Sequence, residues 1–505
     1  MSATEYDAFP YPSSAYPRTH PDRLAVVATL YGIDPPSVDR CRVLELGCGD
    51  GWNLISMAYG LPNSEFTGID LASTPIERGK AFCQELGLRN VHLRQLDLME
   101  AGDLGEFDYI IAHGLYSWVP EPVRRKALEV CARSLARNGV ALISYNAYPG
   151  NHLRDLVRGM MQYHSAHFTR PEEKIRQSRA LVKFLAGSKE PRELYHHLLG
   201  QELKRLENYS DGALFHDDLN PINQPFYFHE FMAQAAPHGF QFLGEAEVSD
   251  NFARHYSPEV EAALAELDPN DLVGHEQYLD FLRCRGFRHT LLCRQDQPRQ
   301  KEMLPERVML LRVAGEIRPA KADADPRSLT PEIFHGANDS QIETNDPILK
   351  TALVHLGTLW PECISFSDLF EHALTVSGAP SDPESRSRAT ESLAAELLQL
   401  LSAAFLEFRA HRLPVVRQAG ATPRSSALAR LQLRVVNFAT SLRQSIVVLD
   451  DPLSHALAGL LDGSRDRAML KKELAGQAVE GGFSITDEAL ETSLHKFARA
   501  ALLEA

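Results

Sequence analysis

Apolar and polar residues follow two alternating periodicities over the first 150 residues. Short apolar runs of the strand type lie at 41–47, 65–71, 91–98, 107–114 and 140–146, and amphipathic helical segments lie at 21–32, 52–61, 74–88 and 121–139. Apolar strands that alternate with amphipathic helices are typical of a parallel sheet with helices on both faces. The pattern therefore predicts an α/β core.

The pattern becomes purely helical from 151 to 210, and strand signals return at 239–249 and 287–295. We expect these two late strands to complete the same sheet, which then has seven strands and is Rossmann-like. The expected fold class is α/β, with a helical insertion in the sheet domain, followed by mostly helical, winged-helix-like C-terminal domains.

The C-terminal half contains two similar blocks of three helices each, and hydrophobic residues after each third helix could form a small hairpin. We expect seven regions along the chain. They are an arm and helix (1–32), a core (33–150), a helical insertion (151–225), a segment that completes the sheet (226–297), a connection (298–345) and two winged-helix-like domains (346–417 and 425–505).

Charge and cysteine content narrow the classes of partner. The 52 Lys and Arg residues against 67 Asp and Glu residues give a net charge of −15, which disfavours nucleic acid and acidic membranes. Seven widely spaced cysteines are typical of free thiols in a reducing compartment. With no signal peptide and no apolar run of about 18 residues, we expect a cytoplasmic protein without stable membrane insertion.

The segment VLELGCGDGWN carries the strongest chemical signal. Gly47, Gly49 and Gly51 follow a predicted strand and open a helix, where backbone N–H groups face a ligand. Glu45 precedes the turn and suits a positively charged ligand better than a pyrophosphate. Two further acids, Asp70 and Asp97, end the next two strands and so lie at the same edge of the sheet.

This constellation resembles the first motifs of class I methyltransferases, which use S-adenosylmethionine and release S-adenosylhomocysteine. The resemblance implies that Asp70 holds the ribose and Asp97 the adenine amine. The residues expected to bind the cofactor are Glu45, Gly47, Cys48, Gly49, Gly51, Asn53, Asp70, Leu71, Asp97, Leu98 and His113.

Other segments are similar to a smaller bacterial branch that carries a methyltransferase regulatory domain. The segments are YPRTHPDRLAVVATLYG, HGLYSWVP, SYNAYPGNHLRD, FYFHEFMAQAAPHGF and QYLDFLRCRGFRHTLLC, and LLDGSRDRAMLKKEL resembles the winged-helix domain of the same proteins. The branch includes rickettsial protein-lysine methyltransferases. The resemblance implies methyl transfer to an amine nitrogen, with a protein or peptide substrate. A homodimer, formed through the C-terminal blocks, is left open.

Candidate catalytic residues follow the fourth and fifth strands and lie in the N-terminal arm. They are Tyr116, Trp118, Tyr145, Asn146, Tyr16 and His20. Each has a structural alternative: the first four could pack loops onto the sheet, and the arm, with Tyr11, could be fixed for stability only. If the arm is functional, we expect it to fold over the cofactor as a lid.

Two alternatives to protein-lysine methylation stay open. One is methylation of a small molecule or natural-product peptide, and the other is a non-catalytic protein that senses the cofactor. We expect no metal site, because the paired histidines lack an acidic partner. We also expect that the insertion and the C-terminal half form a cleft for a polypeptide.

Overall fold

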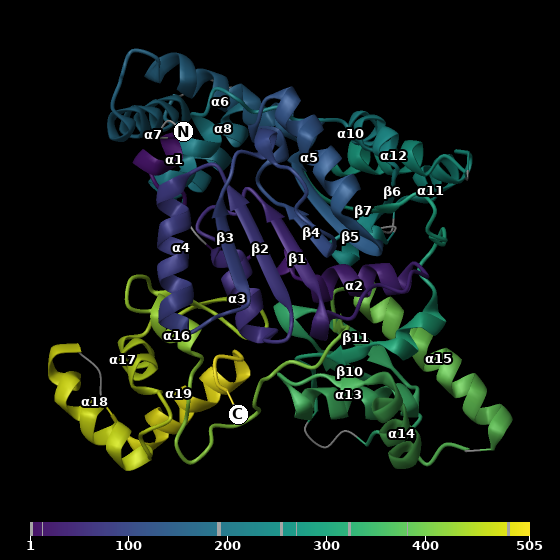
Figure 1. The fold of residues 1–505 in the computed structure, drawn as a ribbon. Helices are drawn as coiled ribbons and strands as arrows, with labels where there is room; N and C mark the ends of the chain where they lie inside the picture. The colour runs from purple at the N-terminus through teal and green to yellow at the C-terminus, as the bar shows by residue number, and fades with distance from the viewer. Residues whose placement is uncertain are drawn as a thin grey trace.

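The computed structural model describes residues 4–12, 14–188, 193–252, 256–268, 270–321, 325–380, 382–481 and 485–504. Its centre is a seven-stranded sheet in the order β3-β2-β1-β4-β5-β7-β6 (Figure 1). These strands are β1 (Arg42–Leu46), β2 (Glu65–Asp70), β3 (Val91–Gln95), β4 (Phe107–Ala112), β5 (Leu135–Asn146), β6 (Phe240–Glu245) and β7 (Phe287–Arg294). The first five are parallel, and β7 pairs antiparallel with both β5 and β6.

Helices cover both faces of this sheet, because alternate residues of each strand point to opposite sides. The face that includes Val43 packs against α2 (Pro21–Leu30), α3 (Trp52–Gly60) and α4 (Ser73–Leu86). The face that includes Leu44 packs against α5 (Glu121–Ser134) and α10 (Phe228–Ala235). The two late strands lie where the sequence places them, at the end of this sheet.

One predicted helix boundary is wrong. The segment 121–139 was expected to be helical throughout, but α5 ends at Ser134 and a strand of 12 residues begins at Leu135. Leu135 pairs with Phe107 of β4, and Arg294 of β7 donates to the backbone carbonyls of Leu135 and Ala136. Pairing with β4 and hydrogen bonds from the Arg294 side chain therefore override the local helical periodicity.

The carboxyl ends of the parallel strands point toward the N-terminal arm and the insertion, at the top of Figure 1. This upper layer contains α1 (Glu5–Ala8), α6 (Asn151–Ser165), α7 (Pro171–Ala186), α8 (Glu193–Glu207) and α9 (Asp211–Ala213). Two further helices, α11 (Pro258–Ala265) and α12 (Leu272–Arg283), lie between β6 and β7 in sequence.

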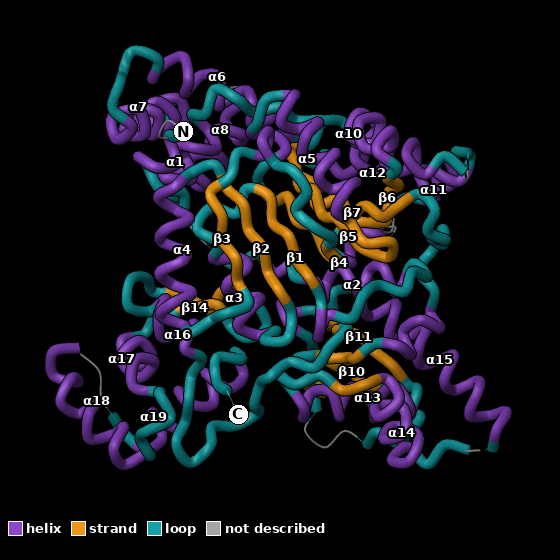
Figure 2. Tube along the Cα trace, viewed as in Figure 1, coloured by secondary structure: helices purple, strands orange, loops and turns teal. Residues whose placement is uncertain are grey.

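The C-terminal modules lie beside the opposite edge of the sheet (Figure 2). The first contains β8 (Arg312–Ala314), β9 (Arg318–Pro319), β10 (Glu332–His335), β11 (Gln341–Thr344), α13 (Pro347–Leu359), β12 (Ile364–Ser365), α14 (Phe366–Ser377), α15 (Pro383–Ser402) and β13 (Glu407–Arg409). The second contains α16 (Ala427–Gln432), β14 (Phe438–Thr440), β15 (Ile446–Val448), α17 (Pro452–Leu460), α18 (Arg467–Gly481) and α19 (Asp487–Arg499). The hairpin of the second module, β14–β15, precedes the three helices α17, α18 and α19 and does not follow them as the sequence suggested.

The second C-terminal module contacts helix α3 of the core. Ser56, in the middle of α3, exchanges hydrogen bonds of 2.8 and 2.7 Å with Gln444. Tyr59, near the far end of α3, accepts a hydrogen bond from Ala427 N at 2.9 Å and donates to Glu504. The modules therefore bind the middle and the far end of α3, away from the glycine loop, and the expected cleft between the insertion and the C-terminal half stays a prediction. In the part of the chain that is described, no helix is both long and apolar enough to cross a bilayer.

Candidate active site

Three glycines shape the turn from β1 into α3. Gly47, Gly49 and Gly51 have φ angles of 72°, 57° and 71°, in the left-handed region that favours glycine. A Cβ atom on Gly51 would lie 2.6 Å from Leu93, whereas one on Gly49 would meet no atom within 4 Å. The turn is therefore tightly packed on its inner side and open at Gly49, where a ligand can approach the backbone.

Asp70, at the end of β2, fixes this turn. Its carboxylate accepts hydrogen bonds from Gly49 N and Ala72 N, both at 2.8 Å. Burial raises the pKa of Asp70, and the two N–H donors oppose that shift. Cys48 is buried beside the turn, and Leu71 is 44% exposed. The sequence prediction that Asp70 and the glycine loop share one edge of the sheet is met by this geometry.

Glu45 is a buried acid with one free oxygen. Its Oε1 accepts from Asn53 Nδ2 at 2.9 Å, whereas Oε2 is buried without a hydrogen-bond partner. Burial raises the pKa of Glu45 to about 8, and the Asn53 donor opposes that shift. The Asn53 oxygen accepts from Tyr16 N at 2.9 Å and faces Thr19. A buried, half-satisfied carboxyl group fits a cationic ligand group, which would complete its hydrogen bonding.

The third acid, Asp97, follows β3, the neighbour of β2 in the sheet. Its Oδ1 accepts from Met99 N at 2.9 Å and so caps the short 3₁₀ turn that begins at Leu98. Leu98 is half-buried and packs against the core. Both residues therefore lie at the same edge of the sheet as Asp70, and their contact with an adenine stays a prediction.

The N-terminal arm lies over this edge. Asp7 Oδ1 accepts from Thr74 N at 2.8 Å and from Ser73 Oγ at 3.2 Å, at the start of α4. Tyr6 stacks on His216 with a centroid distance of 4.1 Å, and His216 Nε2 lies 2.7 Å from the Phe9 carbonyl oxygen. The arm therefore joins the end of β2 to the insertion.

The arm brings charged and phenolic groups close to the acids of the loop. Burial, together with the negative charges of Asp217 and Asp70, raises the pKa of Tyr6 to about 12. Tyr11 donates to Asp217 at 3.3 Å, and Tyr209 donates to the same carboxylate. The sequence pointed to Tyr11 and Tyr16, but nothing local in it indicated Tyr6, Asp217 or Tyr209.

His20 lies away from this arrangement. Its Nδ1 accepts from Asp22 N at 3.2 Å, and its ring stacks on His411 of the first C-terminal module at 5.8 Å. Burial lowers the pKa of His20 to about 3. His20 therefore caps α2 at a domain contact, and the structure does not bring it to the glycine loop.

An aromatic group forms where β4, β7 and the arm meet. His113, after β4, lies 4.2 Å from Tyr16 and 5.3 Å from His289, measured between ring centroids. Phe287 lies 4.9 Å from His289. Burial lowers the pKa of both His113 and His289 to about 3, so both rings are neutral at pH 7. Sequence reasoning missed Phe287 and His289, because only the antiparallel return of β7 brings them to this edge.

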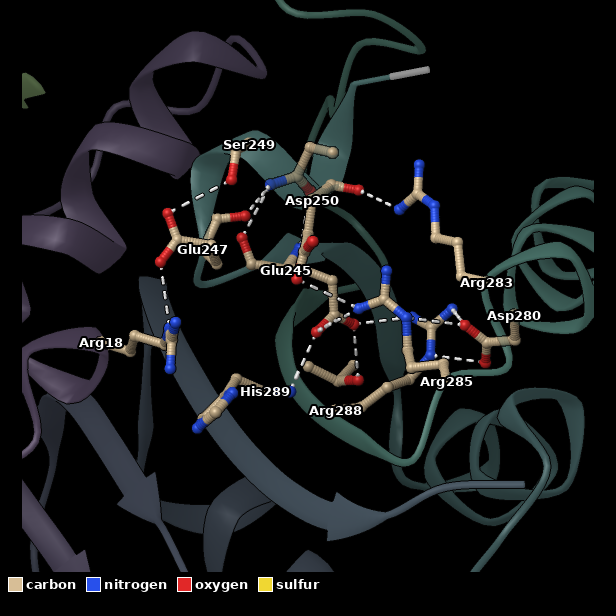
Figure 3. Close-up of polar contacts among 12 residues, drawn as sticks. Arg18, Glu245, Glu247, Ser249, Asp250, Asp280, Arg283, Arg285, Arg288 and His289 are labelled. Carbon is tan, nitrogen blue, oxygen red and sulfur yellow. Dashed lines mark hydrogen bonds and ion pairs between the residues drawn. The ribbon is translucent and has the colours of Figure 1, made fainter. Parts of the chain in front are cut away.

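A buried ion-pair network holds the start of β7. Figure 3 shows Arg288 between Glu245 and Asp280, at 2.6 Å from Glu245 Oε1 and 2.8 Å from each Asp280 oxygen. The other Glu245 oxygen accepts from His289 N at 2.9 Å. Arg288 has no exposed surface, so its positive charge must be compensated inside the protein. Glu245 and Asp280 supply the compensating negative charges. The network therefore fixes the strand that carries His289.

Tyr116 and Tyr145 are core residues. Tyr116 has no exposed surface, and its hydroxyl donates to Gln234 of α10 at 2.8 Å. Tyr145 is 1% exposed, stacks on Phe231 at 4.3 Å, and has its hydroxyl 3.2 Å from Thr290 Oγ1. These contacts match the packing alternative that the sequence left open for both residues.

The two remaining candidates lie nearer the edge. Asn146 ends β5, donates its backbone N–H to Ser117 Oγ at 2.9 Å, and donates from Nδ2 to Asn223 at 2.7 Å. Trp118 lies in a short 3₁₀ turn and is half-buried. Across the described ranges, no three His, Cys, Asp or Glu side chains gather as a metal ion would require.

Comparison with known proteins explains this arrangement. Residues 43–139 match the family model of a methyltransferase domain, 210–294 that of a predicted methyltransferase regulatory domain, and 422–504 that of a PKMT C-terminal winged-helix domain. Two proteins of Rickettsia prowazekii, both described as uncharacterized, are similar in sequence. RP789 is 36% identical over 73% of this chain and 68% of its own length, and RP028 is 38% identical over 47% of this chain and 96% of its own.

A solved structure is similar over nearly the whole chain. PKMT2 from Rickettsia typhi, in complex with AdoHcy, covers 98% of this chain and 100% of its own, with 27% identity and a TM-score of 0.86. A second solved structure of PKMT2 from Rickettsia typhi gives a TM-score of 0.85. The expected fold class, a methyltransferase sheet followed by C-terminal winged-helix structure, is confirmed.

Proposed function

This chain belongs to the S-adenosylmethionine-dependent class I methyltransferases that carry a regulatory domain and a PKMT winged-helix domain, and we propose that it methylates lysine side chains of a protein. The observation that carries the proposal is the similarity to PKMT2 over 98% of the chain at a TM-score of 0.86. That similarity includes the insertion and the C-terminal modules, which methyl transfer to a small molecule does not require.

The proposed cofactor site is the edge formed by β1, β2 and β3. The free Oε2 of Glu45 and the open face of Gly49 suit the amino-acid end of the cofactor. Asp70 suits its ribose, and Asp97 with Leu98 suits its adenine, as in the family motifs. When bound, S-adenosylmethionine supplies a methyl group on a positively charged sulfur.

The proposed acceptor region is the aromatic group of Tyr16, His113, Phe287 and His289, together with Asn146. Methyl transfer is an in-line displacement, so the protein must align the amine and exclude water. A lysine must first lose a proton, which costs about 4–5 kcal/mol at pH 7. Neutral imidazoles and the Asn146 side-chain oxygen can accept hydrogen bonds from an amine without adding charge.

Methylation of defined proteins with labelled S-adenosylmethionine tests this function. The expected result is label on lysine side chains, located by mass spectrometry of the digested substrate, with formation of S-adenosylhomocysteine. An Asp70→Ala variant, in which cofactor binding should be weakened, is the control at subsaturating S-adenosylmethionine. Label found only in small molecules, or on hydroxyl groups, would overturn the lysine assignment and favour methylation of another acceptor.

A further inference from the structure

Five aromatic rings form a continuous series on the surface beside the proposed acceptor region. Their order is His152, Tyr148, Tyr227, Phe281 and Tyr278, with successive centroid distances of 4.0, 5.3, 6.0 and 5.8 Å. We call this series the aromatic rim. Its members come from three places in the sequence: the start of α6, the residue before α10, and α12.

The aromatic rim is exposed. Tyr278 and Phe281 are 50% and 46% exposed, and His152 is exposed as well. Tyr148 and Tyr227 are half-buried. Single exposed aromatic residues are ordinary on protein surfaces, but contiguous exposed apolar rings are typical of an interaction site.

The rim is continuous with the acceptor region. Tyr148 follows Asn146 by two residues, and Asn146 pairs directly with Phe287 across β5 and β7. A Cβ on Gly150 would lie 2.3 Å from the carbonyl oxygen of Cys284, so the loop after β5 packs tightly on the segment that leads into Phe287. The loop after β5 and the segment before β7 therefore connect the aromatic rim with the edge of the sheet where His113 lies.

Two carboxylates place negative charge beside the aromatic rim. Asp155 Oδ2 lies 3.4 Å from the Tyr148 hydroxyl, and Glu230 accepts from Tyr227 N at 3.0 Å. The nearby cation Arg283 is turned to the carbonyl groups of Asp250 and Phe252. Ring faces beside carboxylates favour cationic side chains, through cation–π contacts and charge attraction.

We propose that the aromatic rim binds a cationic stretch of the protein substrate, next to the lysine that is methylated. This inference rests on the proposed function, and it places substrate recognition on the regulatory segment and the start of α6. The described residues of the C-terminal modules lie at the opposite end of the sheet domain, away from α10 and α12 (Figure 1).

Peptide binding to the full chain, saturated with S-adenosylhomocysteine, tests the rim without requiring turnover. The probes are two fluorescein-labelled peptides with one central lysine, flanked in one by arginines and in the other by glutamates. We expect the arginine peptide to bind at least about tenfold tighter at low salt, with a preference that weakens as salt rises. Equal binding of both peptides would overturn the proposal.

Variants locate the binding surface. A Tyr278→Ser/Phe281→Ser double variant should weaken binding of the arginine peptide by about tenfold. Glu230→Gln keeps the acceptor for Tyr227 N and removes the charge, so it should reduce the preference for arginine. The matched control is Leu310→Ser, an exposed apolar residue outside the rim (62% exposed), which should leave binding unchanged.

Three further outcomes separate this inference from the proposed function. If wild-type protein methylates a protein lysine but the rim variants keep the KM for that protein, the rim proposal fails and the function stands. If the rim variants convert a dimer into a monomer in sedimentation experiments, the occupant is a second copy of the chain and the proposal is wrong. Peptide binding without any lysine methylation would count against the function alone.

Discussion

Asn53 donates a hydrogen bond to Oε1 of Glu45 at 2.9 Å, across the glycine loop, and leaves the second oxygen of that carboxyl group buried without a partner. The pair holds the acid in place and keeps one side of it available. Burial raises the pKa of Glu45 to about 8, so the group is mostly protonated at pH 7 in the free protein. A cationic ligand would favour its ionised form.

Cofactor affinity should therefore depend on pH through Glu45. Between about pH 5.5 and about pH 7.5, affinity for S-adenosylmethionine should rise with pH, by at most about tenfold per pH unit, because binding displaces a proton from Glu45. Glu45→Gln should bind more weakly and lose this dependence. Calorimetry in buffers of different ionisation enthalpy measures the released proton, and the ratio of wild-type to variant affinity corrects for titration of the cofactor's own amino group. A ratio that is constant with pH would contradict the assignment.

Titration of Glu45 should also make the stability of the free protein depend on pH. The folded pKa of Glu45 is raised above its unfolded value of 4.5, so its contribution becomes less favourable as pH rises from about 4.5 to about 8. Glu45→Gln should raise the melting temperature of the free protein more at about pH 8 than at about pH 5. Differential scanning calorimetry at the two pH values checks this, and an equal effect at both would be evidence against burial of the charge.

Asp70 should be needed for cofactor binding and for the shape of the loop. Asp70→Ala removes the acceptor for Gly49 N and Ala72 N as well as the proposed ribose contact. Hydrogen bonds to a charged group contribute about 1.5–3 kcal/mol, so we expect affinity for S-adenosylhomocysteine to fall by about 10- to 100-fold. Ligand-induced shifts in melting temperature measure it. Unchanged shifts in this variant would sink the proposed cofactor site.

The N-terminal arm should control how fast the ligand leaves. Asp7 accepts from Thr74 N at the start of α4, and the hydrogen bonds of Thr74 N and Thr4 N lower the pKa of Asp7. Asp7→Ala should release the arm and speed dissociation of S-adenosylhomocysteine by about 5- to 10-fold, the equivalent of about 1 kcal/mol. Stopped-flow displacement measures the rate. Asp39→Ala, at an exposed acid before β1, is the control that should leave it unchanged.

Tyr116 should matter little for turnover. Tyr116→Phe removes the hydroxyl that donates to Gln234 and keeps the buried ring, so stability should fall by about 1 kcal/mol while kcat stays within about twofold. Urea unfolding and methylation kinetics measure the two effects. A large loss of kcat with wild-type stability would restore a catalytic role for this residue.

Much of the fold could be predicted from the sequence, because strand and helix periodicities and the glycine loop are local signals. The five parallel strands, the position of the last two strands at the end of the sheet and the acids at the strand ends all lie where the pattern places them, whereas the antiparallel direction of β7 was not predicted. The boundary of α5 was misjudged because pairing of Leu135 with Phe107 is a long-range effect.

The candidate site was harder to predict than the fold. His113 was found because it follows a strand, but His289 reaches the same place from 176 residues further along the chain. Tyr6 and His216 meet across a similar separation, and no local pattern links them. Tyr116 and Tyr145 looked reactive in sequence because aromatic residues at strand ends serve both pockets and cores, and only their burial separates the two uses.

The helix that opens at the glycine loop, α3, is contacted in its middle by Gln444 and near its far end by Ala427 and Glu504. During synthesis on the ribosome, the N-terminal part of the chain, which contains α3, emerges several hundred residues before these partners. The nascent chain therefore presents an incompletely covered α3 for most of translation. Ribosome-bound intermediates that end before residue 427 should accordingly be more sensitive to protease near Ser56 and Tyr59 than the released protein.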